Sequence, residues 1–187
     1  KTALSSGMYA IVINTTRPVF QDPKLRAALI DLFDFEWANR SLFSGAYTRT
    51  RGFFDNSDLS PSDTPASEAE KALLAPYPDA VTAEILANGW TPPASDGSGL
   101  DRAFMRVGFE KLKQAGYVLK DRRLIGPDGK PVAFEIMLKS NENQQIAVAY
   151  QQTLAKLGIA VTVRSVDAAQ FLQRQINYDF DAMFFNY

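Results

Sequence analysis

The chain has 187 residues, 46% of them hydrophobic and 22% charged, as in a globular protein with a sizeable core. Its 20 basic and 21 acidic residues nearly cancel, which gives no support for a nucleic-acid partner. The absence of Cys and His excludes disulfides, thiolate nucleophiles and histidine-based catalysis within this chain. No apolar run approaches the roughly 20 residues that a membrane-spanning helix needs.

The first part of the chain predicts a strand followed by helices. Residues 8–14 form a continuous apolar run, which is typical of a strand buried on both faces. Asp22 and Pro23 then favour a helix start, with Asp as N-cap and Pro at the first helical position. The apolar stripe that begins at Leu25 is expected to reach Phe43 with a break near Asp34.

Two segments show no periodic pattern of apolar residues. Residues 44–66 are expected to form an irregular loop, and residues 88–100 read as a linker; short helices are expected between them at 66–75 and 79–87. Within the loop, Arg49 and Arg51 alternate with Thr between aromatic residues. They could bind a carboxylate or phosphate, with Tyr47 or Phe53 stacking on the ligand. The alternative is that the arginines are solvated and the aromatic side chains anchor the loop.

The next part predicts a helix, a hairpin and a second helix. Asp101 is expected to begin a helix that ends at Gly116, and GPDGKP is a turn signal between strands near 123–125 and 132–138. Asn141, with Gln144, can cap the helix that follows. The expected buried faces of the two helices comprise Phe104, Val107, Leu112 and Ala115 in the first, and Ile146, Tyr150, Leu154 and Leu157 in the second.

Residues 158–187 predict a compact strand–helix–strand unit. Asp167 with Gln170 forms a capping-box pattern, and Val166 and Phe171 are spaced for a hydrophobic staple. Phe171, Leu172 and Ile176 supply the expected apolar side of the helix. Such a unit implies parallel strands with a right-handed crossover, so the fold class is α/β with a mostly parallel central sheet flanked by helices.

Functional residues are suggested at two kinds of position. Tyr187 lies at the carboxyl end of the last strand, where open α/β sheets bind ligands, although a structural strand-end aromatic fits equally well. Carboxylates cluster on the expected helices. Two of them within about 5–10 Å in a concave site would suit a hydrolase of glycans or peptides, but charge runs on helices are usually a solvated face. The clusters are Asp31, Asp34 and Glu36, and Glu68 with Glu70.

Three stretches together resemble the family 5 extracellular solute-binding proteins. VINTTRPVFQDPKLRAAL is similar to the family pattern that leads from a strand into a helix. LKQAGYVL followed by DGKPVAFEIML is similar to its helix and hairpin, and LGIAVTVRSVDAAQF…DFDAMFFNY to its close. The loop GAYTRTRGFFDNSDL further resembles the microcin C and peptide-binding branch.

The resemblance implies a non-catalytic protein that needs no cofactor and captures a peptide-like solute for the membrane subunits of an ABC importer. Residues 1–187 would be a single lobe, the C-terminal one of a two-lobed, periplasmic binding protein type II-like monomer. The parent would carry a signal peptide and act in the periplasm, or outside the cell at the membrane. A cytoplasmic regulatory module that kept the fold is an alternative. The candidate ligand contacts are Tyr187, Phe184, Gln175, Tyr47 and Arg49.

Overall fold

The structure is a computed structural model that describes residues 8–52, 54, 55, 57 and 64–186. The chain divides into two compact units. The sheet unit comprises Tyr9–Thr48 and Pro93–Tyr187, and the helical unit comprises Lys1–Met8 and Arg49–Pro92. The predicted loop and the predicted linker therefore contain two of the three points at which the chain passes from one unit to the other, at 48/49 and 92/93.

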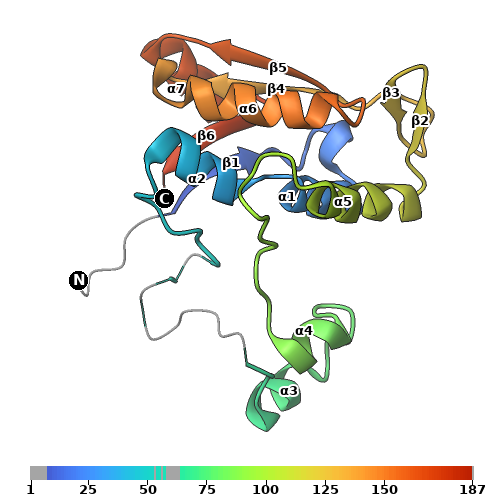
Figure 1. The fold of residues 1–187 in the computed structure, drawn as a ribbon. Helices are drawn as coiled ribbons and strands as arrows, with labels where there is room; N and C mark the ends of the chain where they lie inside the picture. The colour runs from blue at the N-terminus through green and yellow to red at the C-terminus, as the bar shows by residue number, and fades with distance from the viewer. Residues whose placement is uncertain (1–7, 53, 56, 58–63, 187) are drawn as a thin grey trace. The chain divides into compact units, whose positions relative to one another are not determined.

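A four-stranded mixed sheet forms the centre of the sheet unit (Figure 1). Its order is β1 (Tyr9–Ile13), β6 (Ala182–Asn186), β4 (Ala133–Leu138) and β5 (Ala160–Ser165). β4 runs parallel to both β5 and β6, whereas β1 is antiparallel to β6. The parallel relation of β5 and β6 is confirmed, and β4 lies between them. The prediction of a first strand buried on both faces is wrong, because β1 is an edge strand and only partly covered.

Helices pack on both faces of this sheet. Successive residues of a strand point to opposite faces, and Ile136 and Met137 of β4 accordingly belong to two different hydrophobic clusters. The larger cluster contains Leu29, Leu112 and Tyr150 from the helices of one face. The smaller cluster contains Phe171 from the other face. The helices of the larger cluster include α1 (Pro23–Asp31), α5 (Arg102–Gln114) and α6 (Gln144–Ala155), and that of the smaller cluster is α7 (Ala168–Ile176).

The hydrogen bonding confirms the predicted helix starts at Asp22, Asp101 and Asp167. Asp22 accepts from the Lys24 amide at 2.8 Å, which caps α1. The expected break also occurs, because α1 ends at Asp31 and Asp34 caps a separate helix, α2 (Phe35–Phe43). The carboxylates of Asp101 and Asp167 accept from the amides three residues later, each at 2.9 Å, and cap α5 and α7.

The expected hairpin between the strands near 123–125 and 132–138 forms beside its turn, where the Gly126 amide donates to the Lys130 carbonyl and the Val132 amide to the Leu124 carbonyl, at 2.8 Å each. β3 (Arg123–Ile125) also pairs with β2 (Val118–Lys120), which the sequence interpretation missed. Asp121 and Arg122 make the tight turn with φ of 50° and 62°. Between the two hydrogen bonds of the expected hairpin, Ile125 and Pro131 form an isolated antiparallel bridge.

Two expected helix faces differ from the structure. Val107 of α5 is exposed, while Gly108 is buried against Leu32, the C-cap of α1, so closely that an added Cβ would lie 2.6 Å from the Leu32 side chain. In α7, Phe171 is buried but Leu172 and Ile176 are exposed. Phe171 is thus the residue through which this nine-residue helix packs on the sheet, and Leu172 and Ile176 are not needed for that contact.

The helical unit contains α3 (Glu68–Leu74) and α4 (Ala83–Asn88), close to the predicted positions. Ser67 and Glu70 form a reciprocal capping box at the start of α3. The Ala66 amide donates to the Leu86 carbonyl at 2.9 Å, which links the two helices. Across both units, none of the described helices combines the length and the apolarity that crossing a membrane requires.

Candidate functional site

The carboxyl ends of the three parallel strands meet at one edge of the sheet. β4, β5 and β6 end there at Leu138, Ser165 and Asn186. Since β1 is antiparallel to β6, it begins at the same edge, where Tyr9 pairs with Asn186. Ligands of open α/β sheets bind outside the carboxyl ends of the strands, so this is the candidate site. We call Tyr9, Asn143, Phe184 and Asn186 the carboxyl edge.

An aromatic pair dominates the carboxyl edge. The ring centroids of Tyr9 and Phe184 are 5.7 Å apart, with the planes inclined by 30°. Tyr9 is 53% exposed, whereas Phe184 is 8% exposed and belongs to the core. Phe184 therefore supports the Tyr9 ring from below. An exposed aromatic ring on a rigid floor is a suitable contact surface for a ligand.

Asn143 fixes the other end of the Tyr9 side chain. Its amide Nδ2 donates to the Tyr9 hydroxyl. Asn143 occupies the N-cap position of α6 but makes no side-chain capping bond. The prediction that Asn141 caps this helix is also wrong, because Asn141 lies in the 3₁₀ turn η2 (Asn141–Asn143). The Asn143 side chain thus binds Tyr9 of β1 and does not cap the backbone of α6.

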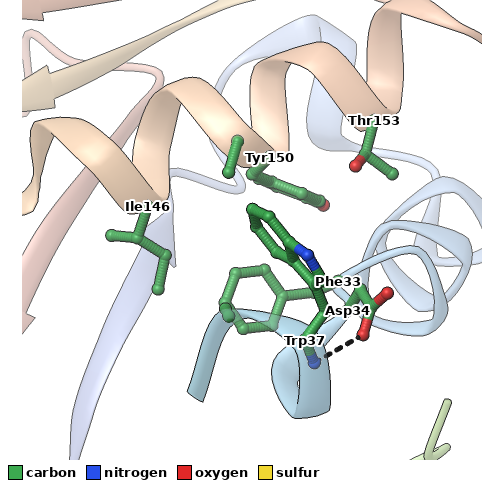
Figure 2. Close-up of a pocket in the computed structure, with 8 residues that line it drawn as sticks. Phe33, Asp34, Trp37, Ile146, Tyr150 and Thr153 are labelled. Carbon is green, nitrogen blue, oxygen red and sulfur yellow. Dashed lines mark hydrogen bonds between the residues drawn. The ribbon is translucent and has the colours of Figure 1, made fainter. Parts of the chain in front are cut away.

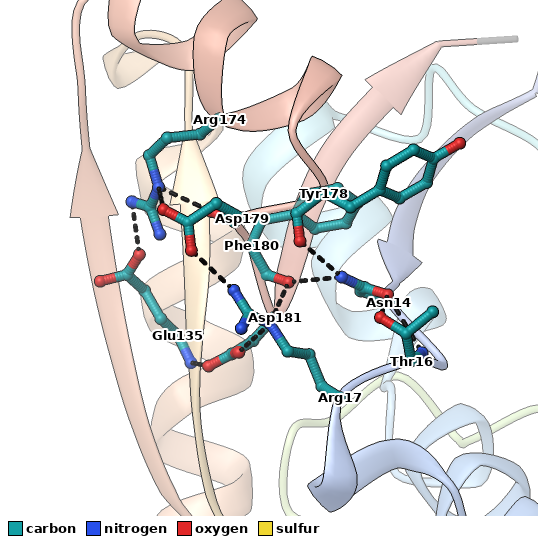
Figure 3. Close-up of polar contacts among 9 residues, drawn as sticks. All are labelled: Asn14, Thr16, Arg17, Glu135, Arg174, Tyr178, Asp179, Phe180 and Asp181. Atoms are coloured by element: carbon teal, nitrogen blue, oxygen red, sulfur yellow. Dashed lines mark hydrogen bonds and ion pairs between the residues drawn. The ribbon is translucent and has the colours of Figure 1, made fainter.

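The opposite end of the β1–β6 pair is closed by polar contacts (Figure 3). Asn14, buried at 5% exposure, donates from Nδ2 to the carbonyls of Tyr178 and Phe180, at 3.0 Å each. Its Oδ1 accepts from the Thr16 amide at 3.1 Å and from the Thr16 hydroxyl at 2.7 Å. Asn14 therefore holds the turn that leads from α7 into β6.

Three arginines and three carboxylates surround this turn. Arg17 pairs with Asp179 at 2.8 Å and with Asp181 at 3.3 Å. Glu135 pairs with both Arg164 and Arg174, at 2.8 Å each. Asp181 also accepts from the Glu135 amide at 3.0 Å. We call Asn14 together with these charged residues the amino-end network. Its charges are matched within the protein, which is typical of a structural lock rather than of a ligand site.

The structure does not bring the predicted ligand residues of the last unit together. Phe184 lies at the carboxyl edge, as described above. Gln175 lies in the last turn of α7, which leads through Tyr178 into the opposite end of β6. Tyr187 lies outside the described residues, so its predicted role stays a prediction.

The predicted loop residues fall in different units. Tyr47 is exposed, and its ring packs edge-on against Phe43 of α2 with centroids 5.0 Å apart. The Asn39 side chain binds both the amide and the carbonyl of Tyr47, at 3.0 and 2.7 Å. Arg49 begins the chain's passage into the helical unit. Arg51 interacts with Asp55 through its amide at 2.6 Å and its Nε at 3.7 Å.

The clustered carboxylates have structural partners. Asp31 is buried and forms an ion pair with Lys111, which joins α1 to α5. Glu36 accepts from the Ser95 amide at 3.0 Å, and Glu70 belongs to the α3 capping box, where hydrogen bonds from Ser67 lower the pKa of its carboxyl. Among the residues that the structure describes, no group of three or more acidic side chains is arranged to hold a metal ion.

Sequence interpretation missed Tyr9 and Asn143. No local pattern marks Tyr9, because it becomes part of the carboxyl edge only through the antiparallel pairing of the first strand with the last. Asn143 is one of several polar residues before α6, and only this placement could have drawn attention to it. The spacing to Gln144 favoured Asn141 as the cap, since a cap pattern does not show which side chain binds a partner far away in the sequence.

An α/β unit with a mixed sheet flanked by helices on both faces is the architecture of the periplasmic binding proteins of type II. The fold is shared with the oligopeptide-binding protein AppA from Bacillus subtilis, solved in complex with a nonapeptide. The TM-score is 0.69 at 22% identity, and the match covers 98% of this chain and 31% of AppA.

The chain belongs to the bacterial extracellular solute-binding proteins, family 5, whose middle-region model matches residues 1–187. A binding protein of Brucella melitensis is 48% identical over 174 residues, which cover 93% of this chain and 28% of the relative. The peptidoglycan-binding protein YepA of Agrobacterium fabrum is 39% identical over 178 residues, covering 95% and 29%. The chain thus spans less than a third of the length of these relatives.

Proposed function

We propose that this chain forms one wall of the solute site in a protein that captures peptides or peptide-like solutes for an ABC importer. Membership of family 5 supports solute capture, and the match extends over residues 1–187. The name of YepA and the nonapeptide bound to AppA support a peptide-like ligand. The solute would be bound and released without chemical change. The site of action would be the periplasm or the outer face of the membrane.

The carboxyl edge is the observation that carries this proposal. Tyr9 offers an exposed ring above Phe184, and the amides of Asn143 and Asn186 lie at the same edge. Aromatic faces combined with a few neutral donors and acceptors suit a peptide, which can be bound through its backbone without selecting particular side chains. The remaining part of the parent chain would supply the opposite wall.

The residues predicted from the family pattern take different parts in this proposal. Phe184 supports the Tyr9 ring, and Tyr187, next in sequence to Asn186, is retained as a contact. Tyr47 and Arg49 are retained as contacts from the loop. Gln175 is not retained, because α7 carries it toward the amino-end network.

Binding of peptides to the full-length parent protein tests the proposal. Calorimetry and native mass spectrometry against a library of short peptides should detect at least one stable complex. Tyr9→Ala should weaken it, while Tyr178→Ala, which removes an exposed aromatic side chain at the opposite end of β6, should not. Tight binding of a sugar or a metal chelate with no peptide bound would contradict the proposed ligand class.

A further inference from the structure

A small hollow lies between α2 and α6, and none of the residues that line it belongs to the carboxyl edge (Figure 2). The rings of Phe33, Trp37 and Tyr150 line it, together with the carboxylate of Asp34 and the side chain of Thr153. Its volume is about 20 Å³, which is room for about one water-sized group. The hollow is therefore far too small for a peptide, whose sites measure about 300–1,000 Å³.

The aromatic lining is fixed by its own packing. Phe33 and Tyr150 meet edge-to-face with centroids 5.3 Å apart. The Tyr150 hydroxyl donates to the Leu29 carbonyl at 2.7 Å, which holds that ring against α1. Trp37 packs on Gly99, where an added Cβ would come within 2.7 Å of the indole. Three aromatic side chains are thus held around one small space.

The carboxylate supplies a negative charge that the protein uses only in part. Asp34 Oδ1 accepts from the Trp37 amide at 3.0 Å and from the Ser95 hydroxyl. Among the described residues, no hydrogen bond or ion pair ends on Asp34 Oδ2. No lysine or arginine is paired with this carboxylate in that part of the chain, in contrast to Asp31, which pairs with Lys111.

We propose that this hollow binds the primary ammonium group of a small-molecule amine. An ammonium group is close to water in size and is attracted to aromatic faces within about 6 Å. The neighbouring carboxylate provides the complementary charge and a hydrogen-bond acceptor. A quaternary ammonium group is too large for the hollow. The site uses none of the carboxyl-edge residues, so it stands or falls independently of the proposed function.

A titration of the full-length parent protein with methylammonium chloride tests this inference. The indole N–H resonance of Trp37, identified by its loss in Trp37→Phe, should shift with saturation in the millimolar range. Sodium chloride and tetramethylammonium chloride at matched ionic strength should leave it unshifted. An equal shift with either salt would overturn the inference, because it would show a general ionic effect or a site without the expected size limit.

Asp34→Asn isolates the charge while keeping the fold. Asparagine is as good an N-cap as aspartate and can still accept from Trp37 and Ser95. This change should weaken methylammonium binding about tenfold, as expected for the loss of one charge-assisted contact. Asp101→Asn, the same change at the N-cap of α5, should leave binding unchanged. Unaltered binding in Asp34→Asn, with both variants folded, would overturn the inference, and so would unaltered binding in Phe33→Leu.

Discussion

The two ends of the β1–β6 pair differ in how they meet their surroundings. At one end, Asn14 and Arg17 bind the turn before β6, and the charged groups there have partners inside the protein. At the other end, Tyr9 presents an exposed ring over Phe184, with Asn143 as its polar partner. The pair is therefore locked at its amino-end network and open at its carboxyl edge.

This difference separates stability from binding along a single pair of strands. Buried polar groups with several partners are costly to disturb, because each lost partner leaves a desolvated atom unpaired. Exposed aromatic residues contribute little to folding but offer apolar area to a ligand. We therefore expect substitutions at the network to change the free energy of unfolding and substitutions at the edge to change affinity for the solute.

The largest effect is expected from Asn14→Leu. The change leaves the carbonyls of Tyr178 and Phe180 without this donor in a buried place, so it should lower the free energy of unfolding by about 2–4 kcal/mol. Denaturant titration measures the loss. Asn186→Leu, the same change at the exposed end of the pair, should cost no more than about 0.5 kcal/mol. Equal losses at the two ends would refute the distinction between them.

A smaller effect is expected from Arg174→Met within the charged part of the network. Arg174 and Arg164 bind the same carboxylate, Glu135, but their side chains are 20% and 59% exposed. Arg174→Met should lower the free energy of unfolding by about 1–2 kcal/mol, and Arg164→Met by about 0.5 kcal/mol or less. Denaturant titration at low and high salt would compare them. A larger loss of unfolding free energy for Arg164→Met than for Arg174→Met would contradict the idea that burial makes these ion pairs stabilising.

Tyr117→Phe extends the comparison to pH. The Tyr117 hydroxyl donates to Asp22 at 2.9 Å and so anchors the segment that follows Arg17. Burial, and next the hydrogen bond to Asp22, raise the pKa of the Tyr117 phenol. A raised pKa gives stability that is fully present below the usual value of about 10 and is lost as pH rises through the folded value.

Tyr117→Phe should cost about 1 kcal/mol at neutral pH. The cost should shrink as pH rises above about 10, because only the wild type then loses the phenol contribution. Thermal unfolding across this range checks the convergence, with Tyr178→Phe, which removes an exposed hydroxyl, as control. A cost for Tyr117→Phe that stays constant at high pH would contradict the assignment.

Much of the fold could be predicted from local pattern. Asp22, Asp101 and Asp167 lie at the predicted helix starts, and Asp34 at the predicted break, because a cap depends on neighbours within three residues. The mostly parallel sheet followed from the strand–helix–strand unit. Pairing partners were less accessible: β2 was missed, since a three-residue strand has too few residues to show a period.

The candidate site was less predictable than the fold. Phe184 could be placed through the family pattern, but Tyr9 and Asn143 come from segments 134 residues apart in the sequence. Their contact depends on which strand lies beside β6, and a strand's own side-chain pattern does not contain that information. The exposed positions of Leu172 and Ile176 show the same limit, because an apolar helical stripe does not reveal how much of it a neighbour covers.

The smallest effect on stability, and the sharpest on binding, is expected at Tyr9. Tyr9→Phe keeps the ring over Phe184 but removes the hydroxyl that accepts from Asn143. The free energy of unfolding should change by no more than about 0.5 kcal/mol, since both groups can bond to water. Affinity for the peptide identified by calorimetry should fall about three- to tenfold, while Tyr178→Phe should change neither quantity.

Asn143→Ala, alone and combined with Tyr9→Phe, shows how Asn143 acts. If Asn143 only positions the Tyr9 ring, the double variant should bind about as weakly as either single variant, because the same contact is lost in each. If the Asn143 amide also touches the peptide, the double variant should bind more weakly than Tyr9→Phe alone. Additive losses from both changes would show two independent contacts, and the Tyr9–Asn143 hydrogen bond would then not be what prepares the carboxyl edge for its ligand.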